Sequence, residues 1–505
     1  LGVIYDGRPD APLISGVTAV RTAAGQPTPN ITVRNYLNDM NADSFKLDFD
    51  TEIKPGLTLK AGYRYQQTNI AIAQRAQSAI AGTTGLPFGF TTAKAVELTA
   101  ALYPGGSAGF LTKQNFGVDL PLMSLTSGLD VIPQLRDLQL TKANEDRAFG
   151  FKSHEQTHAI YGQVDFEGEF GAMPYEGNAG VRAVYTDLLS SAFQTVTLTA
   201  GAGRIVSQQA IPISDTNKYW EYLPSANLTL HPMSNVNVRL GVSKVMTRPE
   251  YESTAPKNTV TIFDRTDPTI DPTQLDNAST GNTKLKPLTA WQYDGTVEYY
   301  TGNGGAYYLS GYYKDITDFI LRGVVQRGVT VLGQGSRLFN STSTINVAKG
   351  KVYGFEIGLD QPLTFLPPAF EGFGVQANYT FVESELKSSN PQLAFGVPGA
   401  SKHNFNGVVY YEKGPFSTRL AYAYRGDFFQ QLGGGVDRAT QPTFTKGYGS
   451  LDLSAGFKIR PNLEITVAGS NLTGENRRDF MIDPDVFRSF IQRSKIYSVS
   501  LRGTF

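Results

Sequence analysis

Strict alternation of apolar and polar residues runs through most of the chain. In residues 45–53 the odd positions carry Phe, Leu, Phe, Thr and Ile, whereas the even positions carry Lys, Asp, Asp and Glu. A period of two is typical of a β-strand with one apolar and one charged face. Lys54, Pro55 and Gly56 then supply turn residues before a second alternating segment, 57–65, so the two segments are predicted to form a hairpin.

The same pattern recurs to the end of the sequence and predicts an all-β fold with about 15 strands. The predicted strands are residues 45–53, 57–65, 160–166, 179–185, 222–230, 236–242, 291–299, 307–313, 353–359, 373–381, 405–411, 418–424, 451–459, 463–467 and 497–505.

The connections between these strands alternate between short and long. Short connections are predicted at residues 54–56, 171–175, 231–235, 301–304, 414–415 and 460–462, with a longer Pro-rich one at 362–371. Long connections are predicted at residues 70–153, 188–217, 248–288, 426–446 and 474–494. A β-sandwich or propeller gives no reason for this asymmetry, whereas a transmembrane antiparallel β-barrel has short turns at one end and long loops at the other.

The two faces of the strands favour the same architecture. In residues 291–299 one face carries Gln292, Asp294, Thr296 and Glu298. Burying four such groups unpaired in a sandwich core would cost several kcal/mol, whereas a wet barrel lumen avoids that cost. Tyr, Phe, Leu and Val fill the opposite face of nearly every strand, which suits a surface in contact with lipid better than a soluble all-β protein.

Composition then narrows the classes of function. Lys+Arg and Asp+Glu both total 45, so no overall positive charge attracts nucleic acid. The chain has 0 Cys and 4 His, which excludes disulfides, thiolate metal sites and cysteine nucleophiles. No apolar run approaches the ~18 residues of a membrane-spanning helix. The chain begins at Leu1 without a signal peptide, so we expect a mature or trimmed product whose true N-terminus is missing.

One short motif suggests zinc. His154, Glu155 and His158 match the H-E-x-x-H pattern, which binds zinc when a helix places both His on one face. Here the segment leads directly into the predicted strand 160–166, which would place both His on the lipid side near the rim and Glu155 opposite. No third ligand is evident, and we therefore predict no metal site.

Several longer stretches carry a family resemblance. They are SKVMTRPEYESTAP (243–256), GNTKLKPLTAWQYDGTVEYY (281–300), YYLSGYYKDITDFI (307–320), a VYGFEIGLDQPL segment from Val352, VQANYTFVESE, SKHNFNGVVYYEKGPFSTRLAYAYR, LDLSAGFKI and ITVAGSNLTGE. In this order and spacing they resemble the C-terminal barrel of a TonB-dependent outer-membrane receptor, of the large type common in Caulobacter- and Xanthomonas-like bacteria. The terminal aromatic Phe505, with Tyr497, Val499 and Leu501 on its face, looks like the assembly signal of bacterial outer-membrane barrels.

The resemblance implies a 22-stranded barrel in the bacterial cell outer membrane, filled by an N-terminal plug. The chain departs from that pattern, since it shows no plug-like segment, no TonB box and only about 15 strands. We therefore expect residues 1–505 to form the C-terminal part of the barrel, without the plug and about seven strands. An intact passive porin of about 16 strands is the alternative.

The function implied by the resemblance is active uptake of a scarce or bulky solute, such as an oligosaccharide. The implied partners are the TonB complex acting through the absent plug, an extracellular ligand (a carbohydrate, a siderophore or similar) and outer-membrane lipid, with no cofactor. An enzyme is not expected, because His is scarce and no serine-nucleophile elbow is present.

Two of the long connections hold the candidate ligand-binding residues, whose rings would stack on sugars and whose charged groups would bind hydroxyls. These are Asp427, Phe428, Phe429, Arg477, Arg478 and Asp479, with Phe480 nearby. Ordinary loop packing at the barrel rim is the competing interpretation. The 70–153 connection contains helix-compatible runs at 71–80 and 93–102, which would suit either a lid over the pore or a surface for a partner lipoprotein or a neighbouring subunit.

Overall fold

The computed structural model describes most of the strands and their connections. The described residues are 4–5, 14–15, 30–80, 147–201, 205–271, 273, 275–331, 335–388, 396–431 and 442–504. Phe505 and the 93–102 run lie outside this set. Within it, no helix has the length and apolar character needed to cross a membrane.

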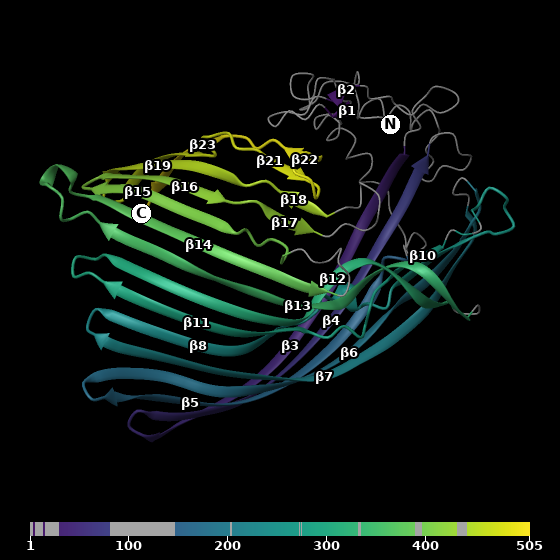
Figure 1. The fold of residues 1–505 in the computed structure, drawn as a ribbon, viewed down its shortest axis with the longest axis horizontal. Coiled ribbons are helices and arrows are strands. Elements are labelled where there is room, and N and C mark those ends of the chain that lie inside the picture. Colours follow the sequence, from purple (N-terminus) through teal and green to yellow (C-terminus); the bar gives the residue numbers. More distant parts are fainter. Residues whose placement is uncertain are drawn as a thin grey trace.

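One large curved sheet forms the body of the molecule (Figure 1). Its wall strands are β3 (Asn30–Lys54), β4 (Leu57–Ile80), β5 (Phe151–Phe170), β6 (Met173–Thr199), β7 (Ile205–Met233), β8 (Val236–Thr247), β11 (Leu288–Tyr300), β12 (Ala306–Val331), β13 (Gly335–Pro362), β14 (Phe373–Ser388), β15 (His403–Lys413), β16 (Phe416–Arg425), β19 (Tyr448–Arg460), β20 (Leu463–Ser470) and β23 (Ile496–Gly503). Each pairs antiparallel with the next along this order, from β3 to β23. Each of the predicted strands overlaps one of these wall strands over its described residues, so the predicted all-β barrel fold is confirmed.

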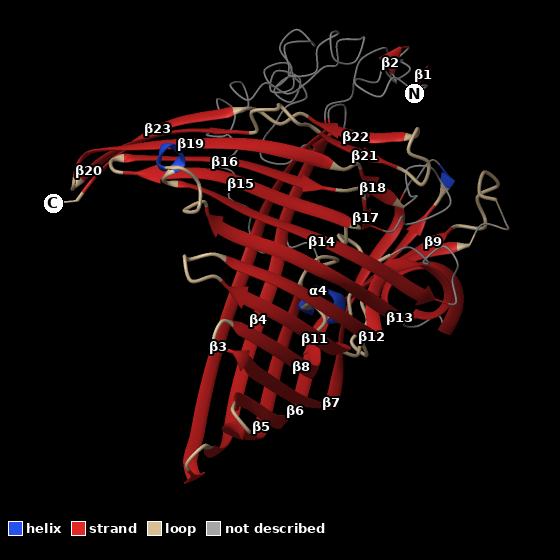
Figure 2. Cartoon of the chain, turned by 60° about the vertical axis from the view of Figure 1, so that its left-hand side comes forward, coloured by secondary structure: helices blue, strands red, loops and turns tan. Residues whose placement is uncertain are grey.

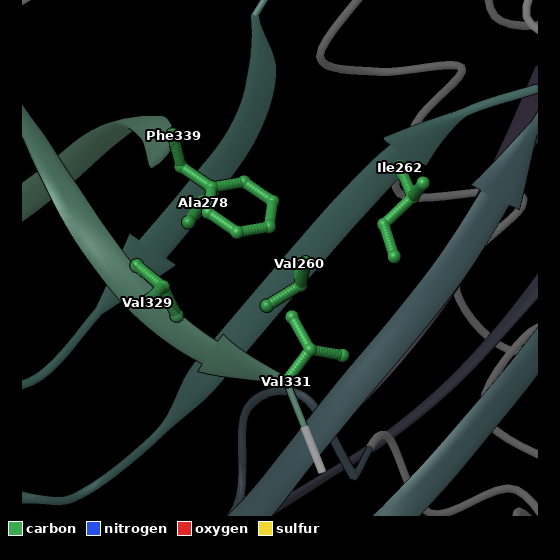
Figure 3. Close-up of a cluster of buried hydrophobic side chains, with 6 residues drawn as sticks. All are labelled: Val260, Ile262, Ala278, Val329, Val331 and Phe339. Atoms are coloured by element: carbon green, nitrogen blue, oxygen red, sulfur yellow. The ribbon is translucent and has the colours of Figure 1, made fainter. Parts of the chain in front are cut away.

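Two short strands close a ring that the sequence did not indicate. β9 (Asn258–Phe263) pairs parallel with β6, and β10 (Asp276–Thr280) pairs parallel with β13. Both strands belong to the 248–288 connection and pair with each other, so this connection links β6 to β13. Val260, Ile262, Ala278, Val329, Val331 and Phe339 form a buried apolar cluster at this junction (Figure 3). The cluster makes the linking hairpin a packed structure rather than a loose loop.

Several strands are longer than the alternation predicted, and they extend at the end of the barrel that carries the long connections. Residues 71–80, a helix-compatible run in the sequence, belong to strand β4. Most of the predicted 188–217 connection is likewise a hairpin, because β6 continues to Thr199 and β7 begins at Ile205. Cross-strand pairing of each extension with its neighbour satisfies the backbone groups there, and this pairing outweighs the helix propensity of the Ala-rich run.

Tight turns join the strands at the opposite end. The turns after β3, β5 and β15 use Gly56, Gly171 and Gly414, with φ of 78°, 67° and 61°. A side chain rarely adopts such angles, which is why glycine occupies these positions. The longest connection on this side, between β13 and β14, contains the short 3₁₀ helix η5 (Pro368–Phe370). The short connections predicted at this end are confirmed, whereas the long connection predicted at 188–217 is mostly taken up by the extended strands β6 and β7.

Aromatic side chains form two belts on the outer face. The belt nearer the long connections, the upper belt, comprises Tyr65, His158, Tyr185, Trp220, Trp291, Tyr293, Tyr313, Tyr353, Tyr379, Phe381 and His403, linked by ring contacts. The lower belt, near the turns, comprises Phe166, Phe170, Tyr175, Tyr299, Tyr307, Phe373, Tyr411, Phe416 and Phe457.

The spacing of the belts matches a bilayer. Tyr175 in the lower belt and Tyr185 in the upper belt lie ten residues apart on β6, which is about 34 Å along the strand at roughly 3.4 Å per residue. A strand tilt of about 45° reduces this to a height of about 24 Å, close to the apolar band of about 25 Å in membrane barrels. The residues between the belts on the outer face are apolar and exposed, including Val297, Leu309 and Ile357. An exposed apolar band flanked by aromatic girdles is the surface of a barrel that spans a membrane.

Candidate ligand-binding mouth and lumen

The candidate residues of the two connections 426–446 and 474–494 are brought together by a small separate sheet. It consists of β17 (Phe428–Gln431), β18 (Thr443–Thr445), β21 (Arg477–Phe480) and β22 (Phe487–Ile491), in that order. Figure 1 places it at the end of the wall opposite the tight turns. Central strand β18 joins the two groups, since Thr445 is opposite both Phe428 and Asp479.

Asp479 lies inside this small sheet. Its Oδ1 accepts hydrogen bonds from Arg477 Nε at 2.9 Å and Thr445 Oγ1 at 2.8 Å, and its Oδ2 accepts one from Ser489 Oγ at 2.7 Å. Burial by itself would raise the pKa of the Asp479 carboxyl, but the bonds from Arg477, Ser489 and Thr445 outweigh burial and hold that pKa below its ordinary value. Asp479 therefore joins three strands of the sheet through its charge and is only 5% exposed.

Phe429 is also internal to the sheet. It is 5% exposed and packs on Phe444, with ring centroids 5.4 Å apart. Phe444 in turn stacks on Phe480 at 5.5 Å. The three rings form the core of the small sheet. The buried position of Phe429 therefore agrees with the competing interpretation, in which this residue packs the loop rather than contacts a ligand.

The remaining candidates lie nearer the surface. Asp427 is exposed, and its Oδ1 accepts a hydrogen bond from the Gly447 amide at 2.6 Å. One face of the Phe428 ring is covered by the guanidinium of Arg425, 3.8 Å from the ring centroid. Arg477 and Arg478 are half-buried, and the Arg478 carbonyl accepts the Lys446 amide at 2.9 Å. These four side chains, unlike Phe429 and Asp479, leave part of their surface open.

The connection after β8 turns inward rather than outward. It contains the short helix α4 (Tyr251–Thr254), which Figure 2 shows inside the curve of the wall. Tyr251 Oη donates to Glu155 Oε1 at 3.1 Å, and Arg248 Nε lies 3.9 Å from the same oxygen. Burial, together with the nearby Glu155 carboxylate, raises the pKa of Tyr251 to about 12.

The returning part of that connection packs against α4. Thr283 Oγ1 donates to the Thr254 carbonyl at 2.9 Å, and the Asn282 amide donates to the Ser253 carbonyl at 2.9 Å. Ala255 and Leu285 are fully buried. The end of the segment 243–256 and the start of the segment 281–300, singled out separately in the sequence, therefore meet in one inward strap, which we define as residues 248–257 and 281–287. The sequence carried no signal that they meet.

Carboxylates dominate a hollow of the inner wall close to the tight turns. The hollow, of about 820 Å³, is lined among others by Glu52, Glu167, Glu176 and Asp294. The bases that approach it are paired: Lys60 with Asp165 at 2.5 Å and Arg239 with Glu298 at 3.1 Å. As predicted, the polar face of β11 points into the lumen.

The H-E-x-x-H segment lies in β5 and has strand geometry. His158 belongs to the upper belt and bonds Tyr63 Oη at 2.8 Å, while His154 bonds Asn69 Oδ1 at 2.6 Å. Glu155 faces the strap on the other side of the sheet. Both His are on the lipid side, as predicted, and among the described residues no group of three or more His, Cys, Asp or Glu could hold a metal ion.

Comparison with known families decides the identity of the fold. The family described as "TonB dependent receptor-like, beta-barrel" matches residues 4–472. The chain belongs to the TonB-dependent receptor family. Its members are outer-membrane receptors rather than enzymes, so the predicted family, localisation and absence of an enzyme class agree with this assignment.

Individual TonB-dependent receptors resemble the chain over part of their length. The chain is 27% identical to the iron-regulated outer membrane virulence protein of Vibrio cholerae serotype O1 over 198 residues, 38% of this chain and 28% of that protein. Two solved structures share the fold. The ferric citrate transporter FecA in the unliganded form has a TM-score of 0.54 and 12% identity, and the match covers 94% of this chain and 56% of that chain. The copper transporter OprC has a TM-score of 0.55 and 14% identity, and the match covers 94% of this chain and 58% of that chain. The chain thus spans little more than half the length of these structures.

Membership in the TonB-dependent receptor family orients the barrel. The tight turns face the periplasm and the long connections face the outside. The small sheet β17–β18–β21–β22 therefore lies at the extracellular mouth, and the strap lies in the upper lumen. The two belts mark the two interfaces of the outer membrane.

Proposed function

We propose that the chain is the C-terminal part of a 22-stranded receptor that actively takes up a scarce or bulky solute across the outer membrane. In this proposal an N-terminal plug fills the lumen, and the TonB complex pulls on the plug to open a path. The family assignment supports a TonB-linked role, and the receptor's full activity is the proposed part.

The observation that carries this proposal is the polar inner wall. A wide lumen lined by Glu52, Glu167, Glu176 and Asp294 offers charged groups that a polar plug can pair with. The described residues of β3 and β23, at the two ends of the run of paired strands, are also exposed along almost their whole length. Further wall strands between them would pair the edges that lipid does not tolerate.

For the ligand we propose that the mouth contacts it through Asp427, Phe428, Arg477 and Arg478, while Phe429 and Asp479 hold the small sheet in shape. Two ligand classes remain. The Vibrio cholerae relative is named an iron-regulated outer membrane protein, and this name favours an iron chelate as the ligand. The half-open Phe428 ring beside charged groups would equally suit an oligosaccharide, the class expected from the sequence. The Caulobacter- and Xanthomonas-like subtype stays a prediction.

Uptake into whole cells tests the proposal against a passive porin. Cells that carry the receptor would be given a radiolabelled iron chelate or a labelled oligosaccharide, with and without an uncoupler that collapses the inner-membrane proton gradient. An energised receptor loses accumulation when the gradient or TonB is removed. Uptake that persists without both, together with ion conductance in planar bilayers, would establish the porin alternative.

The extent of the receptor is tested by the intact mass of the protein purified from outer membrane, with N-terminal sequencing. A mass well above 55.0 kDa and a plug-like extension before Leu1 are expected. A mature protein that begins at Leu1 would overturn the plugged-receptor proposal.

A further inference from the structure

Tyrosine rings lie over glycine residues at two points of the inner wall. Tyr308 on β12 is opposite Gly358 on β13, and its ring fills the space above that glycine, so that a Cβ at position 358 would overlap the ring. Tyr410 on β15 covers Gly374 on β14 in the same way. Both glycines are buried, and both tyrosines are half-buried. One side of each ring therefore packs on the wall while the other side faces the lumen.

The Tyr308 ring belongs to a hollow of the inner wall on the neighbouring strands β11, β12 and β13 (Figure 1). Tyr308 is opposite Glu298 of β11, whose polar face points into the lumen. The hollow has a volume of about 440 Å³ and is lined among others by Tyr300, Tyr308, Tyr312, Glu298 and Glu356. We call it the tyrosine hollow. Its lining includes Tyr300 and Ala306, the residues on either side of the tight turn between β11 and β12, so the hollow reaches the periplasmic rim.

Two carboxylates are held beside the rings of the tyrosine hollow. Tyr308 Oη donates a hydrogen bond to Glu356 Oε1. Tyr300 Oη donates to Glu298 Oε2 at 2.9 Å, and Arg239 Nε donates to Glu298 Oε1 at 3.1 Å. Each carboxylate accepts three hydrogen bonds from the wall, whereas its two oxygens offer about four lone-pair positions. One position on each carboxylate is therefore left for a hydroxyl group of a solute.

The charges in and around the tyrosine hollow favour an uncharged solute over an anionic one. Among the described residues that line the hollow, none is basic. The two cations nearby are Arg239, which pairs with Glu298, and Lys314, whose Nζ lies 5.9 Å from the Tyr312 ring centroid. The larger hollow described above shares Thr296 with this one and adds four carboxylates, those of Glu52, Glu167, Glu176 and Asp294. A surface lined mainly by one sign of charge repels solutes of that sign.

We propose that the tyrosine hollow binds the sugar rings of a neutral oligosaccharide on its way from the lumen to the periplasm. This inference rests on the proposed uptake function and selects one of its two ligand classes. A pyranose has a face of C–H groups, which packs on an aromatic ring, and hydroxyls at its edge, which reach carboxylate acceptors. Tyr308 and Glu356 supply this combination of ring and acceptor. Tyr300 and Glu298 repeat it on the adjacent strand, which suits a solute built of repeated sugar rings.

The test uses the full-length receptor purified from outer membrane in detergent. The probe is maltohexaose, an uncharged oligosaccharide, and saturation-transfer NMR measures its dissociation constant with and without an excess of ferric citrate, an anionic chelate. The test variant is Tyr308→Ala. The matched control is Tyr410→Ala, because the Tyr410 ring also covers a buried glycine but is not part of the tyrosine hollow.

The wild type and Tyr410→Ala are expected to bind maltohexaose equally, and ferric citrate should not displace it. Tyr308→Ala should bind it about fivefold to tenfold more weakly, the effect of losing one aromatic contact. Absence of binding by the wild type, equal affinity of the two variants, or displacement by ferric citrate would overturn the proposal. If Tyr308→Ala does not fold, Tyr308→Leu decides, because leucine still covers Gly358 but offers no flat ring and should show the same loss.

The assay separates this inference from the proposed function, because neither TonB nor a proton gradient takes part in it. Binding that depends on Tyr308, combined with cellular uptake that persists without the gradient, would refute active transport and leave the sugar site in place. Energised uptake of maltohexaose, combined with unchanged binding in Tyr308→Ala, would refute the sugar site alone.

Discussion

Gly281 lies against the carbonyl oxygen of Ala255, so closely that a Cβ at position 281 would overlap that oxygen. The Gly281 amide also donates to the Lys257 carbonyl at 2.8 Å. These contacts join the outgoing and returning halves of the strap at the point where both enter the lumen. The absence of a side chain at one position is thus what allows the two segments to pack.

Gly281→Ala should destabilise the strap. Because the obstacle is a backbone atom, the two segments would have to separate, and we expect a loss of about 1–3 kcal/mol, typical of overpacking. Thermal unfolding in detergent measures this loss. Gly162→Ala is the matched control, since a Cβ there meets nothing within 4 Å. Equal midpoints for the two variants would contradict the packing described for Gly281.

Asp479→Asn should loosen the small sheet at the mouth. The change removes the charge that three hydrogen bonds stabilise, and a cost of about 1–3 kcal/mol is expected. Limited proteolysis of the extracellular loops in intact cells reports the loosening, with the exposed Asp485→Asn as control. Unaltered cleavage in Asp479→Asn would show that the sheet does not depend on this carboxylate.

The same carboxyl predicts a pH dependence. Its pKa is lower in the folded chain than the ordinary 3.8, so its contribution is complete above about pH 4 to 5 and is lost as the pH falls through the folded value. Wild-type loops should therefore become more sensitive to an acid-active protease below pH 4. Asp479→Asn should show no such acid step.

Tyr251→Phe should weaken the anchoring of α4. It removes the hydrogen bond to Glu155 and is expected to cost about 1 kcal/mol at neutral pH. Since the folded pKa of Tyr251 is raised from 10.0 to about 12, the folded state keeps a proton that the unfolded chain releases, and the stability from this group falls as the pH rises from 10 to 12. The difference in unfolding midpoint between wild type and Tyr251→Phe should shrink over that interval. A constant difference would contradict the role of this hydroxyl.

The two tryptophans provide an optical test of the membrane boundary. Trp220 and Trp291 are the 2 Trp of the chain, and both lie in the upper belt, 52% and 39% exposed. In lipid vesicles, quenchers attached near the headgroup should reduce their fluorescence more than quenchers at the acyl chain ends. Strong quenching by aqueous acrylamide with no effect of lipid-bound quenchers would place the belt outside the membrane.

Ligand binding at the mouth should depend on its open side chains. Once a ligand is known, Arg478→Ala and Phe428→Ala should each weaken its binding by about tenfold, the effect of losing a charged or aromatic contact of 1.4 kcal/mol. Isothermal titration measures the dissociation constants. Thr473→Ala, an exposed change outside the small sheet, is the control, and unchanged affinity in both test variants would move the binding surface elsewhere.

Alternation along the chain determined the wall of the barrel. Because side chains in a strand alternate between faces, a repeated apolar–polar pattern requires one lipid face and one wet face. This rule predicted the wall strands, the short turns between them and the lipid-side placement of His158. The order and spacing of the sequence motifs indicated the family, because each motif reflects the local packing of one strand or turn.

Contacts between distant segments were decided only by the tertiary structure. The strap, the parallel pairing of β9 with β6 and β10 with β13, and the small mouth sheet all join residues separated by long connections. Short strands such as Thr443–Thr445 give too few residues for a period to appear, and the extension of β4 through 71–80 depends on its neighbours. Likewise Phe429 and Asp479 were chosen as surface groups for their chemistry. They are interior groups because β18 pairs with both β17 and β21 and so joins the two connections in one small sheet.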